Sequence, residues 1–167
     1  LQGLAETSTA SHVEYKKALA IAARTYAYYH YLDGTKHADR GFTLDSVWDQ
    51  VYRGVGAEER LPDFVRAVKE TRGEIATYNG DVAITPYFGH SDGRTRGWEE
   101  VWSKKISKSY LTPVEAEYDR AQGYTKLLGH GGCMSQWDAN ERAKHGTPAE
   151  EIIRYYYRGV ALQKAWE

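Results

Sequence analysis

Residues 11–34 read Ser-His-Val-Glu-Tyr-Lys-Lys-Ala-Leu-Ala-Ile-Ala-Ala-Arg-Thr-Tyr-Ala-Tyr-Tyr-His-Tyr-Leu-Asp-Gly, and they predict a long helix over residues 12–32. Ser11 and Glu14 have the spacing of a capping box, in which each side chain bonds the backbone amide of the other residue. The Asp33-Gly34 pair is a typical helix end. One face of the helix is apolar at helical spacing, and is formed by Leu19, Ala22, Ala23, Tyr26 and Tyr29.

Shorter elements are predicted on the C-terminal side of this helix. A helix is expected over residues 58–72, with Pro62 in its first turn. Asn79-Gly80, between the runs 74–78 and 81–85, is a strong signal for a hairpin with a type I′ turn. Ser135 is expected to cap a helix that runs to His145. Residues 147–150, Thr-Pro-Ala-Glu, indicate a second capping box and a helix to about Tyr157.

The remaining segments give weaker signals. Residues 1–5 read as the end of a strand or a lead-in segment, and extended pieces are expected around 42–44 and 50–52. Helices and hairpins follow one another without a regular βαβ rhythm. The sequence therefore predicts an α+β fold in a single domain over residues 1–167, with the long helix, the hairpins and the C-terminal helices around a substrate groove.

The composition restricts the class of protein. The 167 residues carry a net charge of -1 without a basic stripe, which argues against nucleic-acid binding. The single cysteine, Cys133, excludes an intrachain disulfide and a multi-cysteine zinc site. No apolar stretch approaches the ~20 residues of a membrane span. The chain starts at Leu1 rather than Met, which we interpret as a trimmed or mature fragment, so the missing signal peptide says nothing about compartment.

Aromatic residues are abundant, with 14 Tyr and 5 Trp. They could fill a tyrosine-rich core or line a groove that binds carbohydrate. Four tryptophans could offer flat apolar surfaces to sugar rings, although each alone is more typical of a core: Trp48, Trp98, Trp102 and Trp137.

Residues 129–137, Gly-His-Gly-Gly-Cys-Met-Ser-Gln-Trp, indicate a binding cleft. The glycines leave the backbone bare, so a ligand can approach it closely, and His130, Ser135 and Gln136 supply polar groups beside them. Metal binding by His130 has weak support because no HExxH or His-x-His pair is present. A Ser-His-Asp triad, with Ser91 as one candidate, stays open, although there is no G-x-S-x-G elbow.

Two charged residues near the N-terminus have two interpretations each. Glu6, on a loop before the long helix, is either a surface charge or a general acid whose pKa is raised by partial burial. Arg24 stands in an otherwise apolar helical stretch, so it needs either an ion-pair partner or a ligand.

Seven stretches, in order along the chain, resemble motifs of the SpoIID/LytB domain, the family of stage II sporulation protein D and the amidase enhancers of bacterial cell walls. The stretch 17–27 is similar to its "LKAQAIAARTYA" helix, 50–54 to "QVYRG", and 129–137 to "GHGVGMSQWGA". The other four are residues 1–6, 67–80, 86–95 and 152–159. The family's N-terminal membrane anchor or signal is not expected in this chain.

The resemblance implies a lytic transglycosylase that cleaves peptidoglycan glycan strands outside the cytoplasm, with Glu6 as the essential acid. It implies a cleft lined by Arg24, Tyr26, Gln50, Tyr52, Ser91, His130, Ser135 and Gln136. No cofactor is expected, and no zinc, because residues 44–49 lack the cysteines with which some members bind it.

Three alternatives to this activity stay open. The first is a non-catalytic glycan-binding enhancer of a cell-wall amidase. The second is a hydrolase with a second carboxylate, for which Asp92 is a candidate. The third is a metal hydrolase that uses His130.

The chain departs from the family pattern at three places. Thr7-Ser8 replaces the usual Met-Pro after the acid, and 89–93 keeps only part of "SSSGG". Cys133 stands where glycine is usual, so a positive φ there would cost conformational energy.

Overall fold

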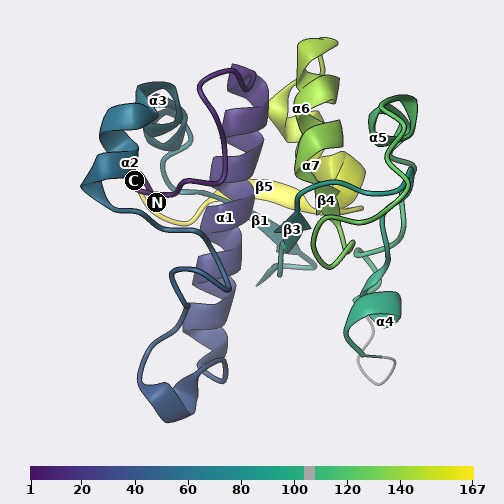
Figure 1. Cartoon of the computed structure of the whole chain (residues 1–167). Helices are drawn as coiled ribbons and strands as arrows, with labels where there is room; N and C mark the ends of the chain where they lie inside the picture. The colour runs from purple at the N-terminus through teal and green to yellow at the C-terminus, as the bar shows by residue number, and fades with distance from the viewer. Residues whose placement is uncertain (104–107) are drawn as a thin grey trace.

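The computed structural model describes residues 1–103 and 108–167 and confirms the α+β fold. The long helix α1 (Val13–Asp33) stands in the middle of the molecule (Figure 1). The helices α2 (Val55–Arg60) and α3 (Pro62–Glu70) lie on one side of it, and α6 (Gln136–Lys144) and α7 (Ala149–Tyr156) on the other. The two chain ends lie close together beside α2. Among the described residues, no helix has the length and apolar character needed to cross a membrane.

The bounds of α1 match the prediction, but its capping does not. The Nδ1 atom of His12 accepts the amide of Glu14 at 3.3 Å, so His12 and not Ser11 is the N-cap. The Glu14 carboxylate instead accepts the backbone amide of Ala149 at 2.9 Å. The predicted capping box is therefore wrong, because Glu14 caps the start of α7 rather than its own helix.

The helix predicted over residues 58–72 is two helices, α2 and α3, which meet at Leu61. Leu61 has φ -124° and ψ 54°, because Pro62 disfavours helical backbone in the residue before it. Phe64, Ala67 and Val68 form the buried face of α3, which packs on α1.

A three-stranded antiparallel sheet covers one part of α1 and has the order β2-β1-β5. The strands β1 (Glu74–Tyr78) and β2 (Asp81–Val82) form the predicted hairpin, with positive φ at both Asn79 and Gly80. The third strand, β5 (Ala161–Lys164), pairs with β1 and was not expected from the sequence.

The second half of the chain forms the side of the molecule that lies across α1 from α2 and α3. A short parallel pair joins β3 (Tyr87–Phe88) to β4 (Met134–Ser135), which brings the glycine-rich run beside Tyr87. Ser135 caps α6 as predicted. The capping box at Thr147 is wrong: Pro148 is the N-cap of α7, without a side-chain bond. The remaining elements are η1 (Ala38–Arg40), α4 (Trp98–Val101) and α5 (Glu117–Ala121).

Candidate functional site

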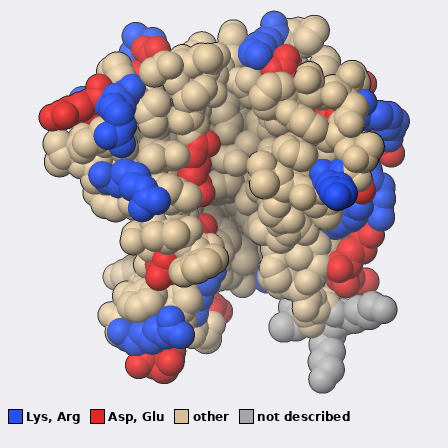
Figure 2. Space-filling view, viewed as in Figure 1, with Lys and Arg blue, Asp and Glu red and all other residues tan. Residues whose placement is uncertain are grey.

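A groove runs down one face of the molecule between its two walls, with acidic side chains along it (Figure 2). It contains two cavities, of about 530 Å³ and about 660 Å³, and Glu6 lines both of them. We call the first the aromatic cavity, because its lining includes Tyr26, Trp48, Tyr87, Phe88, Trp98 and Trp102. We call the second the polar cavity, because its lining includes Ser8, Ser11, His90, Gln136, Asn140 and Lys144.

Backbone pairing fixes the position of Glu6. The lead-in segment runs antiparallel to residues 51–53: Ala5 donates to the Val51 carbonyl at 2.8 Å, and Arg53 donates to the Gly3 carbonyl at 2.8 Å. From the opposite wall, Gln136 donates through Nε2 to the Glu6 carbonyl at 3.1 Å. The acid is thus held between segments far apart in the sequence.

The Glu6 carboxyl is half-buried and has few partners. Burial raises its pKa, and hydrogen bonds from the Tyr87 hydroxyl and the Val51 amide offset only part of that effect. A carboxyl with a raised pKa stays protonated closer to neutral pH, which is the property that a general acid needs.

Two glutamines support the groups around Glu6. Gln50 is buried, donates to the Ala23 carbonyl at 3.0 Å and hydrogen-bonds the Tyr87 hydroxyl. Gln136 hydrogen-bonds Tyr15 as well as the Glu6 backbone, and it lines the polar cavity. Gln50 therefore contacts Tyr87 and lines neither cavity.

Tyr87→Phe is expected to shift the alkaline limb of the pH profile of kcat/KM to higher pH by about 1–2 units. The Tyr87 hydroxyl donates to the Glu6 carboxylate and lowers its pKa, and a hydrogen bond to a charged group is worth roughly 1.5–3 kcal/mol. The pH dependence of the glycan cleavage that the family resemblance implies tests this. Tyr26→Phe is the matched control, because its hydroxyl bonds Lys36 in the same cavity. An unmoved limb in Tyr87→Phe would contradict the role of this hydroxyl.

His130 lines the aromatic cavity, and its ring hydrogen-bonds backbone groups. Nδ1 accepts the Gly132 amide at 3.0 Å, and the ring also hydrogen-bonds the backbone of Tyr87. Desolvation by the surrounding protein lowers the pKa of His130, so the ring is neutral at neutral pH. It faces Phe88 and Trp102. Within residues 1–103 and 108–167 there is no group of three or more His, Cys, Asp or Glu side chains that could hold a metal ion.

Ser91 and Ser135, which the sequence placed in the cleft, are fully buried and line neither cavity. Both hydroxyls donate at 2.7 Å to one oxygen of Asp119, which also accepts the Ser91 amide. Burial raises the pKa of Asp119. Through Asp119 of α5, the two serines therefore connect the 89–93 loop with the start of α6.

Three other predicted ligand residues have different locations. Tyr26 lines the aromatic cavity. Tyr52 is half-exposed and lines neither cavity; its ring lies against Gly3. Arg24 is buried away from the groove and donates to the carbonyls of Glu74 and Val68, at 2.9 and 3.1 Å, so it holds α1 to the segment between α3 and β1.

Neither the contact of Tyr87 with Glu6 nor an ion-pair cluster in the aromatic cavity was predicted from the sequence. Asp49 forms an ion pair there with Lys36 at 2.6 Å, and it is hydrogen-bonded to His37 at 2.7 Å. Burial opposes ionisation of Asp49, but hydrogen bonds from the Asp45 amide, Lys36 and His37 lower its pKa overall. Tyr87 lies in a stretch that resembles a family motif, which could have drawn attention to it.

Cys133 adopts φ 68°, so the expectation of strain at this position is confirmed. The side chain is buried, and burial raises the pKa of its thiol. The thiol is therefore protonated and has a structural environment rather than a reactive one.

The sequence is similar to those of several known proteins. Residues 4–78 match the family model described as stage II sporulation protein. An uncharacterized protein of Brachyspira hyodysenteriae is 38% identical over 112 residues, 66% of this chain and 28% of that protein. The stage II sporulation protein D of Bacillus subtilis is 44% identical over 41 residues, 25% of this chain and 12% of that protein. The amidase enhancer of Bacillus subtilis is 32% identical over 117 residues, 70% of this chain and 15% of that protein. The chain thus matches less than a third of each of these relatives.

Proposed function

The chain belongs to the SpoIID family, and from this premise we propose that it is a lytic transglycosylase that acts on peptidoglycan glycan strands outside the cytoplasm. The observation that carries the proposal is Glu6. It is a half-buried carboxyl with a raised pKa where two cavities of one groove meet. Aromatic side chains along the groove suit sugar rings, which present flat apolar faces.

The reaction needs one carboxyl in two protonation states. Protonated Glu6 gives its proton to the bridging oxygen as the bond from C1 of N-acetylmuramic acid to that oxygen breaks. The 6-hydroxyl of the same sugar then attacks C1, and its proton passes to the Glu6 carboxylate. One C–O bond breaks and one forms, Glu6 regains its proton, and the product has a 1,6-anhydro end. Intramolecular attack needs no activated water.

The carboxyl groups of the groove favour this reaction over hydrolysis with a pair of carboxylates. Among the described residues, those lining the two cavities belong to Glu6 and Asp49, and Asp49 is engaged by Lys36 and His37. Asp92, the candidate second carboxylate, lines neither cavity and pairs with Arg96 at 2.7 Å. The Arg96 guanidinium lowers the pKa of Asp92 to about 2. A hydrolase would need a second carboxylate free to act as nucleophile or to activate water.

The second candidate function is a non-catalytic enhancer that binds glycan and stimulates a cell-wall amidase. The match to the amidase enhancer of Bacillus subtilis, which covers 70% of this chain, favours it. This candidate also uses the groove, but it makes no use of the raised pKa of Glu6.

The chemistry of the products is expected to separate these functions. Glycan strands, both intact and stripped of peptides, are incubated with the protein and analysed by mass spectrometry. Cleavage should yield 1,6-anhydro ends. Reducing ends, heavier by one water, would indicate a hydrolase instead. Absence of cleavage on both substrates, together with stimulation of an added amidase, would support the enhancer.

A further inference from the structure

The position of Glu6 within the groove bears on which glycosidic bonds can reach it. Glu6 lines both cavities, so a ligand bound in either cavity lies beside this residue. Both cavities fall in the range of roughly 300–1,000 Å³ that is typical of small-molecule sites. A site that removes terminal sugars needs sugar contacts mainly on one side of the acid. This groove has aromatic and polar side chains on both.

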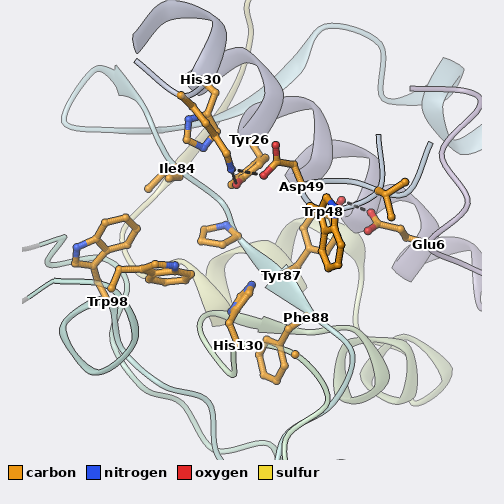
Figure 3. A pocket seen from close by; sticks show the side chains of 15 residues that line it. Glu6, Tyr26, His30, Trp48, Asp49, Ile84, Tyr87, Phe88, Trp98 and His130 are labelled. Atoms are coloured by element: carbon orange, nitrogen blue, oxygen red, sulfur yellow. Dashed lines mark hydrogen bonds and ion pairs between the residues drawn. The ribbon is translucent and has the colours of Figure 1, made fainter. Parts of the chain in front are cut away.

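One tryptophan of the aromatic cavity, Trp48, contributes little to the packing of the fold. Trp48 is 89% exposed and lines this cavity together with Glu6 and Tyr87, and Figure 3 shows Trp98 at the other side of the cavity. Its turn is fixed all the same, since the amides of Val47 and Trp48 donate to Asp45 at 2.7 and 2.8 Å. A large apolar ring on a fixed turn, with so little of its surface buried, is suited to stacking on a ligand.

A second aromatic surface lies across the aromatic cavity from Trp48. The rings of Trp98 and Trp102 lie 4.6 Å apart, and Trp102 lies 5.0 Å from His130. Trp102 packs directly over Gly132, where an added Cβ would lie 2.7 Å from its ring. The glycine-rich run therefore makes room for this aromatic surface.

The polar cavity has its own aromatic surface. Tyr124 stacks on His90 at 3.8 Å between ring centroids and meets the edge of Trp137 at 5.9 Å. Trp137 is 37% exposed, and the amides of Gln136 and Asn140 line the same cavity. Aromatic rings beside amide groups match the faces and the acetamido and hydroxyl groups of amino sugars.

We infer that the groove binds sugars on both sides of Glu6, with Trp48 as a stacking residue on one side and Trp137 on the other. Cleavage therefore falls at internal bonds of the strand rather than at its ends. This inference rests on the proposed lytic transglycosylase function.

The first test uses long peptide-stripped glycan strands labelled at one end, with product lengths followed from the first few per cent of turnover. Internal cleavage gives products of many lengths at once. Release of terminal disaccharides alone, with anhydro ends formed, would overturn the inference and leave the proposed function standing. Absence of anhydro ends altogether would instead overturn the proposed function.

The second test compares Trp48→Ala with Trp137→Ala on an end-labelled strand of defined length. Each variant is expected to raise KM about 2- to 13-fold, from a stacking contribution of roughly 0.5–1.5 kcal/mol, and the two should move the preferred cleavage position in opposite directions. Trp166→Ala is the matched control, because this partly exposed ring packs on Tyr28 and lines neither cavity of the groove. Shifts in the same direction, or none, would contradict binding on both sides.

Discussion

Glu6→Gln is expected to lower kcat for glycan cleavage by about 10³- to 10⁴-fold. Positioned acid–base groups contribute roughly 10²–10⁴-fold each, and in the proposed mechanism one carboxyl both protonates the leaving oxygen and accepts the proton of the 6-hydroxyl. Glutamine keeps the shape of the side chain and an oxygen that can accept the Tyr87 hydroxyl. The variant should therefore still fold and bind glycan. The rate of formation of anhydro ends is the measurement.

Stability gives a second, independent test of Glu6→Gln. Because burial raises the pKa of Glu6, the folded chain holds this proton more tightly than the unfolded chain does. Glu6 therefore reduces the stability of the fold as the pH rises from its unfolded pKa through its folded pKa. Glu6→Gln removes that cost, so its Tm at pH 8 should equal or exceed that of the wild type.

Asp92→Asn is the matched control for loss of a carboxylate. Asp92 lies outside both cavities in an ion pair with Arg96, so cleavage should stay within about twofold of the wild type. If Glu6→Gln retained more than a tenth of the wild-type rate, Glu6 would not be the acid. If Asp92→Asn lost activity as Glu6→Gln does, a mechanism with two carboxylates would replace the one proposed.

Local patterns in the sequence predicted the local parts of the structure. The long apolar face predicted α1 to within a residue at each end, and Asn79-Gly80 predicted the hairpin. Both signals come from residues that are close together in the sequence and contact one another within a single helix or hairpin. Strand β5 was missed because its stability comes from pairing with β1, about 85 residues earlier in the sequence.

The partners of polar residues were harder to predict, because a short polar side chain looks the same whether it faces a ligand or a buried group. Ser91 and Ser135 follow glycines in cleft-like loops, but both bond the buried Asp119. Glu14 has the spacing of a capping box, but it caps a helix that begins 135 residues later. The resemblance to a family identified Glu6 as the candidate acid, whereas its hydrogen bond with Tyr87 could be found only from the folded structure.

The largest loss of stability is expected for Asp138→Ala, at about 3–5 kcal/mol in the free energy of unfolding. Asp138 is fully buried, and it accepts the Tyr118 amide at 2.8 Å, the Arg142 guanidinium at 2.6 Å and the Tyr156 hydroxyl. Removing it leaves a nearly buried guanidinium without its closest anion, and breaking such a pair from one side is typically this costly. Denaturation by urea at neutral pH measures the loss.

Glu141→Ala on the same helix shows whether this loss comes from burial or only from charge. Glu141 pairs with Lys144 at 2.6 Å near the surface, and exposed pairs contribute roughly 0–1 kcal/mol. Both variants remove one carboxylate from α6, so their difference gives the cost of leaving Arg142, the Tyr156 hydroxyl and the Tyr118 amide without their buried acceptor. Because α6 also presents Gln136 to the Glu6 carbonyl, the surviving folded fraction of Asp138→Ala should bind glycan more weakly than Glu141→Ala does. Equal losses of stability in the two variants would show that the buried network around Asp138 does not hold this wall of the groove.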